Sequence, residues 1–508
     1  MRFTEPEFIP EISLTHSSAA LGNYEIAEQA AEVLSELLNA DSDYERVLLR
    51  AAAGAGKSYV LKRLVRETIS HPNVTRVCVT AFTNRQIQPL ARDLGSALGK
   101  RDVCLFVSKE REAELPADVR NAVTVATTLN DIPQTARVVV GTIHKIRAYP
   151  GSKYISTLGE ATNGRDPFDV LFVDEAWQVA HHLFDKLTYY SPVKVGVGDV
   201  GQLPPLEVGQ NPWKGDPGYN PYRAWPTEWE EGDAKTWVAE LPTVWRPTSQ
   251  QLALWRAFYP DWAQLNSVAG PGDRSVILNE LEGLTKEVWE QVASGTPTLL
   301  EVEGLPAPTD PDVDLELIRV LEVLLNSLFE SGFQLHSRQF DDSGSPTEHF
   351  EIAEPRKNQG DPLVAILATR NQAVDDATDV VHRLREKYDL TEHDIVSSTV
   401  DSWQGQTNGI TVAIHPLSGA DALDEFNSAF GRLAVTCTRA THGLLMITRT
   451  GLDELLLDSP AKPGTPLGEP GFRTLPRQTH SRILLTFARG TVNWSSEIQS
   501  EENNNGQN

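Results

Sequence analysis

The stretch AAAGAGKSYV, residues 51–60, carries residue types that can hold a phosphate chain. Gly54 and Gly56, which flank Ala55, let the backbone come close to an anion. A run of backbone N–H groups, followed by the first turn of a helix, can then face the phosphates. The spacing matches the pattern G-x-x-x-x-G-K-[ST] of a phosphate-binding loop, apart from the first glycine. We therefore expect a nucleotide site here.

Two further side chains in this stretch define its chemistry. Lys57 brings a positive charge to the β- and γ-phosphates of ATP, and the Ser58 hydroxyl can ligate Mg²⁺. The first position of the pattern holds Ala51 instead of glycine. That glycine only opens the turn, so alanine is tolerated there if its φ is negative. The alternative for this motif alone is a glycine-rich turn that binds no ligand.

A pair of carboxylates, Asp174 and Glu175, follows the apolar run Val170–Val173. Ligands bind at the carboxyl ends of strands in doubly wound sheets, so both side chains are expected at a ligand site. Asp174 can hold Mg²⁺ through its water shell, and Glu175 can orient and deprotonate the attacking water. An acidic turn that caps the next helix would explain Asp174 alone, but not its pairing with a phosphate loop.

The elements that must position these residues follow from alternating patterns. Arg46–Arg50 reads as a buried strand before the phosphate loop, and Ser58–Ile69 as a helix after it. Further apolar runs alternate with helical stretches, which predicts an α/β fold with doubly wound parallel sheets. These runs are Arg76–Thr80, Arg137–Val140, Val170–Val173 and Val193–Val197, and then Thr298–Val302, Leu363–Leu367, Ile410–Ile414 and Leu444–Ile447.

The two sets of strands predict two domains with a boundary near residue 240. We expect one domain over residues 1–240, a second over 241–455 with an acidic insertion around 265–360, and a C-terminal extension over 456–508. Glu316–Glu330 has helical apolar spacing, whereas the polar stretch 340–360 reads as a loop. The tail beyond Ser495 has the composition of a disordered segment.

The order of the motifs resembles that of superfamily 1 helicases. Residues 174–178, DEAWQ, and 198–205, GDVGQLPP, look like motifs II and III of the branch that contains RecD and the nonsense-mediated-decay helicase. The resemblance covers about residues 24–450 and includes Ala51, because members of the superfamily often carry alanine there. It implies two tandem RecA-like P-loop domains, ATP and Mg²⁺ as cofactors, and a catalytic role for Gln202.

The resemblance also assigns residues to nucleic acid. Ala81–Asn84 resembles motif Ia and Gly141–His144 the TxH motif, both of which line the single-strand channel in the family. Gln29 is similar to the glutamine of the Q motif, which binds adenine. For Phe82 and Trp403, packing in the core is an equal alternative to stacking on bases. The implied strand contacts are Phe82, Thr83, Asn84, Thr142, His144, Thr399 and Trp403.

Three motifs of the second domain complete the resemblance. Trp245-Arg246 resembles motif IV, which implies that Arg246 reaches the γ-phosphate. Residues 398–405 look like motif V, with Gln404 and Gly405 on the nucleotide, although the acidic residue that usually follows is missing. Residues 432–440 resemble motif VI, which makes Arg439 an arginine finger. A guanidinium stabilises the charge that phosphoryl transfer builds on the γ-phosphate oxygens.

Composition limits the remaining classes. The chain of 508 residues has a net charge of −25, and residues 265–360 contribute −12 of it through eighteen acids and six bases. This balance lowers the expectation of nucleic-acid binding without excluding a local basic groove. Cys78, Cys104 and Cys437 form no C-x-x-C pair, so we expect buried packing residues and no disulfide or metal cluster. With no signal peptide and no membrane-spanning run, the sequence predicts a cytoplasmic protein.

Two functions compete. The leading interpretation is a helicase that hydrolyses ATP to move on a single strand, DNA more than RNA, and unwinds duplex 5′ to 3′, a direction that rests on the resemblance alone. The alternative is an ATP-driven switch that acts through a protein partner and unwinds little. The acidic balance favours the switch, as do the segments 85–136 and 411–431, which are too short for large accessory domains. A motor of this size could also need a partner for loading or strand separation.

Overall fold

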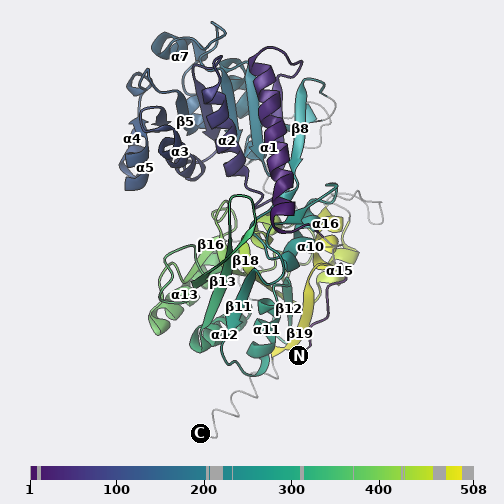
Figure 1. The fold of residues 1–508 in the computed structure, drawn as a ribbon. Helices are drawn as coiled ribbons and strands as arrows, with labels where there is room; N and C mark the ends of the chain where they lie inside the picture. The colour runs from purple at the N-terminus through teal and green to yellow at the C-terminus, as the bar shows by residue number, and fades with distance from the viewer. Residues whose placement is uncertain are drawn as a thin grey trace. The chain divides into compact units, whose positions relative to one another are not determined.

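The computed structural model describes residues 2–8, 13–201, 205, 221–230, 233–308, 314–369, 371–424, 427, 430–460 and 476–494. The chain divides into two compact units (Figure 1). The first unit is Gly22–Pro242, and the second unit combines Met1–Leu21 with Thr243–Asn508. The first residues were expected in the first domain, but they group with the second unit, where Thr4 forms an antiparallel bridge to Arg489.

The first unit is built on a sheet of eight parallel strands. Their order is β4-β3-β5-β2-β6-β7-β1-β8, and every neighbouring pair is parallel. Most residues of the central strands are apolar, as is typical of buried parallel strands, although β7 includes Lys194 and β1 includes Arg46 and Arg50. The strands are β1 (Arg46–Ala51), β2 (Val77–Ala81), β3 (Val103–Phe106), β4 (Thr124–Ala126), β5 (Val138–Thr142), β6 (Val170–Asp174), β7 (Val193–Gly198) and β8 (Thr236–Leu241).

Helices cover this sheet and begin at the carboxyl ends of its strands. α2 (Lys57–Ser70) and α3 (Asn84–Leu98) pack together on the sheet (Figure 1). Side chains of the strands and of the shorter helices form one apolar cluster, in which Phe184 stacks on Trp225 at 4.0 Å between ring centroids. The remaining helices are α1 (His16–Leu38), α4 (Lys109–Ala113), α5 (Ala117–Ala122), η1 (Leu129–Asp131), α6 (Ile143–Ile146), α7 (Gly151–Leu158), η2 (Ala176–Gln178), α8 (His181–Phe184), η3 (Asp185–Tyr190) and α9 (Thr227–Glu230).

The second unit contains a sheet of six parallel strands in the order β16-β15-β17-β18-β12-β19. Together with the first sheet it confirms the expected fold class, which is α/β with a parallel sheet in each of two units. The strands expected in both sets are present, with ends shifted by at most four residues. The strands of this sheet are β12 (Thr298–Glu303), β15 (Val364–Ala368), β16 (Ile395–Thr399), β17 (Asn408–Ile414), β18 (Ala440–Arg449) and β19 (Ala488–Asn493).

The helices of the second unit surround this sheet. The helix expected over Glu316–Glu330 is confirmed as α12, which starts after Asp314, whose side chain accepts a hydrogen bond from the N–H of Leu317 at 3.1 Å. The helices are η4 (Ser249–Gln251), α10 (Leu252–Phe258), α11 (Gly283–Ala293), α12 (Leu315–Ser331), α13 (Asn371–Tyr388), α14 (Phe430–Cys437), α15 (Leu452–Asp458) and α16 (Pro476–Leu484). A short parallel pair joins β9 (Thr243–Val244) to β10 (Asn266–Ser267).

The prediction of a loop over residues 340–360 is wrong, because this stretch contains a β-strand. β14 (Pro346–Ala353) runs antiparallel to β13 (Phe333–Phe340), which also pairs with β11 (Arg274–Leu278). No residue of β14 is buried, so its sequence lacks the apolar alternation of a half-buried strand. The turn between the strands is closed by Asp341, whose side chain accepts from the N–H groups of Ser343 and Ser345.

The C-terminal extension contributes to the second sheet, because β19 pairs in parallel with β12. The tail beyond Ser495, expected to be disordered, lies outside the described residues. The three cysteines are free and buried, as expected. Among the helices of the described residues, none combines the length and the apolar character needed to cross a membrane.

Candidate functional site

The phosphate loop joins β1 to α2. Ala51 is the last residue of β1 and pairs with Leu241 of β8, so it continues the extended strand and has no need of glycine. Gly54 and Gly56 do need to be glycine, since their φ angles are 73° and 82°. Gly56 lies directly before the first turn of α2 and accepts hydrogen bonds from the N–H groups of the next helical residues. The expected strand, loop and helix are therefore confirmed.

The carboxylates after β6 face this loop. Glu175 adopts a left-handed backbone with a φ of 49°, an unusual conformation for a residue other than glycine. Its Oε1 lies 2.9 Å and its Oε2 3.1 Å from Lys57 Nζ. Asp199, which follows β7, places Oδ2 at 3.9 Å from the same Nζ. The turn thus aims a general-base candidate at the residue that is expected to hold the phosphates.

Charge is unbalanced in this cluster. Burial and the neighbouring charge of Glu175 together raise the pKa of Asp174 to about 7, against the opposing charge of Lys57. Burial alone would lower the pKa of Lys57, but the charges of Glu175 and Asp199 outweigh it and the pKa is raised. One lysine therefore faces three carboxyl groups, so the site has a deficit of positive charge.

A hard cation fits that deficit. The expected ligands are Ser58, which is exposed at the start of α2, and Asp174, which is buried at the end of β6. Within the described residues no group of three His, Cys, Asp or Glu side chains forms a ready-made metal site. Mg²⁺ usually keeps several waters and uses one or two protein carboxylates together with phosphate oxygens, so the donor set of Ser58 and Asp174 fits it.

Close packing holds the turn that carries Glu175. Gly198, at the end of β7, lies against η2: a Cβ atom there would be 2.7 Å from Trp177 Cε3 and 2.8 Å from the backbone N of Ala176. Asp199 Oδ1 then accepts from the N–H of Gly201 at 2.9 Å. The glycine of the GDVGQLPP motif therefore places Asp199 beside Lys57. Gln202, expected to be catalytic, lies outside the described residues.

α1 contacts the phosphate loop through a residue that the sequence did not single out. Asn23 is buried, and its Nδ2 donates to the carbonyl of Ala55 at 2.9 Å. Gln29, the expected adenine contact, is exposed on the same helix six residues later, about 9 Å along its axis. A single asparagine within a helix belongs to no recognisable sequence pattern, so the sequence did not identify this contact.

The residues expected to bind a strand in the first unit gather at the ends of two neighbouring strands. Ala81 of β2 pairs with Thr142 of β5, so Phe82 and His144 follow side by side. Their rings lie 5.5 Å apart between centroids. Thr83 and Asn84 form the start of α3, with Thr83 as its exposed N-cap, and Thr142 caps α6 by accepting from the N–H of Lys145.

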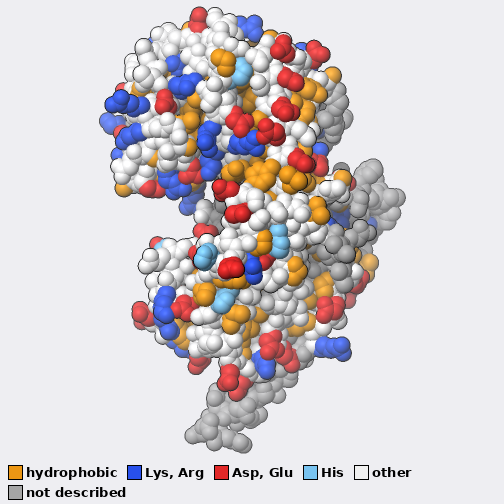
Figure 2. Space-filling model, viewed as in Figure 1, with side chains coloured by type: hydrophobic (Ala, Val, Ile, Leu, Met, Phe, Trp, Pro, Cys, Tyr) orange, Lys and Arg blue, Asp and Glu red, His pale blue; other side chains and the backbone are white. Residues whose placement is uncertain are grey.

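Two aromatic side chains next to this group were missed. α8 packs against α6, and its His182 is exposed and contacts Tyr222 at 5.3 Å between ring centroids. Burial lowers the pKa of His144, and the nearby charges of Arg147 and His182 lower it further. Figure 2 shows Lys and Arg side chains gathered over α3, α4 and α5, and Asp and Glu side chains over α1. Short helices of mixed composition gave no sequence signal for this arrangement.

In the second unit the residues of motifs V and VI come together within that unit. Thr399 ends β16 and accepts from the N–H of Ser402 at 3.2 Å, and Trp403 Nε1 donates to Asn408 Oδ1 at 3.0 Å. Gln404 and Gly405 lie in the turn that follows, where Gly405 has a φ of 82°. The indole N–H thus ties this turn to the start of β17.

The two arginines of the second unit, Arg246 and Arg439, both donate a hydrogen bond to Thr438. Arg246 Nη1 donates to the carbonyl of Thr438 at 2.9 Å. Arg439 is only 2 % exposed and donates to the carbonyls of Val435 and Gln406 and to Thr438 Oγ1. The guanidinium expected to act as a finger is therefore bonded within its own unit in this structure.

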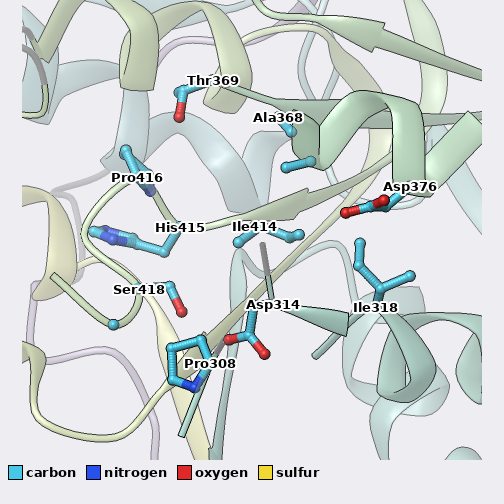
Figure 3. A pocket seen from close by; sticks show the side chains of 12 residues that line it. Pro308, Asp314, Ile318, Ala368, Thr369, Asp376, Ile414, His415, Pro416 and Ser418 are labelled. Carbon is cyan, nitrogen blue, oxygen red and sulfur yellow. The ribbon is translucent and has the colours of Figure 1, made fainter. Parts of the chain in front are cut away.

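A hollow opens at the carboxyl ends of β15 and β17 (Figure 3). Thr369, Ile414 and His415 come from these strand ends, and Asp314 and Asp376 from the starts of two helices. Arg449 neutralises Asp314 through contacts of 2.6 and 2.8 Å. None of the residues that the sequence predicts for the site lines this hollow.

Comparison with known proteins identifies the first unit in part. A family model described as AAA domain matches residues 35–208, about a third of the chain. No curated protein matches. Among solved structures, the PRRSV helicase has 15% identity and a TM-score of 0.37, covering 82% of this chain and 56% of its own. An arterivirus nonstructural protein 10 (helicase), solved in complex with DNA, has 14% identity and a TM-score of 0.35, covering 81% and 62%.

The chain thus spans roughly three fifths of the length of these two viral structures, and similarities this low support no argument about residues or activity. The family match is different, because it coincides with the loop geometry given above. It begins before β1 and ends within the segment after β7, so it includes the phosphate loop and both carboxylates. Residues 35–208 are therefore similar to an AAA domain over a stretch that contains the phosphate loop and both carboxylates.

Proposed function

We propose that this chain is an ATP-dependent nucleic-acid helicase. It hydrolyses ATP, moves along a single strand, DNA in preference to RNA, and separates duplex in the 5′ to 3′ direction. The direction follows only from the family that the motifs resemble.

One observation carries the proposal. Five neighbouring strands, in the order β5-β2-β6-β7-β1, end along one edge of the first sheet. The strand-binding candidates follow β5 and β2, and the nucleotide candidates follow β6, β7 and β1. Neighbouring strands lie about 4.8 Å apart, so the whole set spans roughly 19 Å. An NTPase centre and a strand-binding surface on one rigid edge is the arrangement that a nucleic-acid motor needs.

The chemistry assigned to the first unit uses its own charges. Lys57 exchanges its contact with Glu175 for the β- and γ-phosphates, and this frees the Glu175 carboxylate to orient water and accept its proton. Mg²⁺, held by Ser58 and Asp174, would neutralise phosphate charge during transfer. Gln29, Gly54, Ala55 and Gly56 complete the nucleotide contacts in this proposal.

The second unit is proposed to supply positive charge and further contacts. Arg246 and Arg439 stabilise the charge on the γ-phosphate, and Gln404 and Gly405 contact the nucleotide. For Arg439 this requires its present hydrogen bonds to break, so the rate depends on a rearrangement of the motif V and motif VI turns. Thr399 and Trp403 are proposed to contact the strand.

A second candidate is an ATP-driven switch that acts through a protein partner and unwinds little. The charge distribution favours it, since the acidic region 265–360 includes β14, an exposed edge strand suited to a protein contact. The Lys and Arg side chains over α3–α5 (Figure 2) give the helicase only slight support, because these three helices carry five bases and four acids.

Steady-state ATP hydrolysis separates the two candidates. The purified chain is assayed alone, with single-stranded DNA and with single-stranded RNA, at low and moderate salt, with Lys57→Ala as the blank. The proposal predicts strong stimulation by one polymer. Basal turnover that neither polymer stimulates would contradict the helicase and direct attention to a protein partner.

A further inference from the structure

We infer that Gln86 and Gln178 form a positioning pair that transmits strand binding at Thr83 to the carboxylate of Glu175. Neither glutamine contacts nucleotide or strand in this scheme, so both act through their neighbours. The inference rests on the proposed function, because it requires that a strand contact Thr83.

The strand side of the pair is the N-terminus of α3. Gln86 Oε1 accepts from the N–H of Thr83 at 2.8 Å, and Thr83 Oγ1 accepts from the N–H of Gln86 at 3.3 Å. This is a reciprocal capping box, which fixes the cap residue relative to the helix. Thr83 is exposed, so a ligand can reach it, and any shift of Thr83 displaces the side chain of Gln86.

The nucleotide side is the short helix η2. Gln86 Nε2 donates to Gln178 Oε1 at 3.1 Å, and the N–H of Gln178 donates to the carbonyl of Glu175 at 2.9 Å. Gln178 is only 7 % exposed. Because η2 contains three residues and is packed against Gly198, a displacement of Gln178 cannot be absorbed before it reaches Glu175.

The amide chemistry separates this pair from ordinary capping. A capping box needs only an acceptor at position 86, and glutamate serves it as well as glutamine. Glutamine keeps the acceptor and adds a donor, and that donor is the group that reaches Gln178. The side chain thus bonds both candidate sites at once.

The element that changes state is the ion pair between Lys57 and Glu175. With that pair formed, the carboxylate is unavailable to water. A strand bound at Thr83 pulls on Gln86 and Gln178 and favours the orientation of Glu175 in which the pair is broken. The coupling is reciprocal, so nucleotide must change strand affinity through the same contacts.

The test uses the full chain and four variants. Gln178→Leu breaks the link and leaves the capping box intact, while Gln86→Leu breaks both. The double variant tests whether the two act as one unit. Gln88→Leu makes the same change two residues further along α3, about 200° around the helix, and serves as the matched control.

We expect the ratio of strand-stimulated to basal kcat to fall about three- to tenfold in Gln178→Leu and in Gln86→Leu, the range expected for one hydrogen bond. The double variant should fall no further, and Gln88→Leu should match the unmodified chain. The strand concentration for half-maximal stimulation should stay within about twofold in Gln178→Leu, because Thr83 keeps its cap.

Two contrary results are distinguishable. If Gln178→Leu is stimulated as strongly as the unmodified chain while Gln86→Leu is not, the glutamine is only a cap and the inference is overturned, although the helicase proposal stands. If the unmodified chain hydrolyses ATP but no strand stimulates it, the proposed function fails and the inference fails with it.

Discussion

The two units hold their charged groups in opposite ways: Lys57 and Glu175 lie at the carboxyl edge of the first sheet, whereas Arg439 directly precedes β18 at the amino edge of the second. In the first unit, Lys57 and Glu175 face each other with side chains 12 % and 13 % exposed, and each is paired to a partner that a ligand can replace. In the second unit, Arg439 is 2 % exposed and bonded to backbone carbonyls of its own unit. The first edge is therefore ready for a nucleotide, whereas the second has to give up internal contacts before its guanidinium is free.

The largest effect expected from this difference is in Arg439→Ala. Nucleotide affinity should be retained, and turnover should fall by roughly 10³ to 10⁵ if the side chain acts as a full arginine finger. The measurement is kcat together with equilibrium binding of a nucleotide analogue. Arg432→Ala is the control, because Arg432 lies on α14, which ends two residues before Arg439, and pairs at 3.4 Å with Asp401. Equal rates in both variants would remove Arg439 from the site.

Glu175→Gln probes the first edge. The amide cannot accept the proton of the attacking water, so turnover should fall by about 10² to 10⁴, while nucleotide still binds. Pre-steady-state turnover and nucleotide binding measure the two quantities separately. Asp199→Asn changes the other carboxylate near Lys57 and should reduce turnover less. Unchanged hydrolysis in Glu175→Gln would mean that another group is the base.

Acid should destabilise the second unit through buried histidines. Burial, together with the charge of Arg274, lowers the pKa of His442 to about 3, and burial lowers the pKa of His480 to about 4. Burial also holds the pKa of His415 well below its usual value. Because the unfolded chain binds these protons first, stability is full above about pH 6.5 and is lost as pH falls toward 4.

The expected loss is about 1.4 kcal/mol per pH unit for each histidine that is protonated only on unfolding. Hydrogen exchange of the β18 amides between pH 6.5 and 5, corrected for the intrinsic pH dependence of exchange, measures it within the second unit. His442→Gln should flatten the slope by about one third. A slope that does not change in that variant would show that His442 already titrates normally in the folded unit.

The smallest effect concerns the start of the phosphate loop. Ala51→Gly should leave ATP hydrolysis unchanged and cost about 0.5–1 kcal/mol of stability, since glycine loses more backbone freedom in a strand. Gly56→Ala is the matched opposite, because a φ of 82° strains any side chain, and it should reduce turnover. For both variants, chemical denaturation measures the stability and steady-state ATP hydrolysis measures the turnover. A gain of activity in Ala51→Gly would show that glycine is preferred there after all.

The sequence predicts those parts of the fold and of the site that depend on apolar runs and on the spacing of glycines. The central strands, the helix after the phosphate loop and the placement of Asp174 and Glu175 at a strand end follow from those patterns. β14 was missed because it is exposed on both faces. The contact of Asn23, the burial of Arg439 and the bond between Gln86 and Gln178 depend on side-chain packing between distant segments, which periodicity does not encode. The roles of the site residues stay predictions.

Strand displacement tests the central claim most directly. A labelled duplex with a single-stranded tail at either the 5′ or the 3′ end is mixed with the chain, with and without ATP, and Lys57→Ala is the control. The account predicts ATP-dependent displacement from the 5′-tailed duplex, less from the 3′-tailed duplex, and none with Lys57→Ala. If the strand stimulates ATP hydrolysis but no labelled strand is released from either duplex, the helicase proposal is contradicted. The chain would then be an ATPase switch that binds a strand.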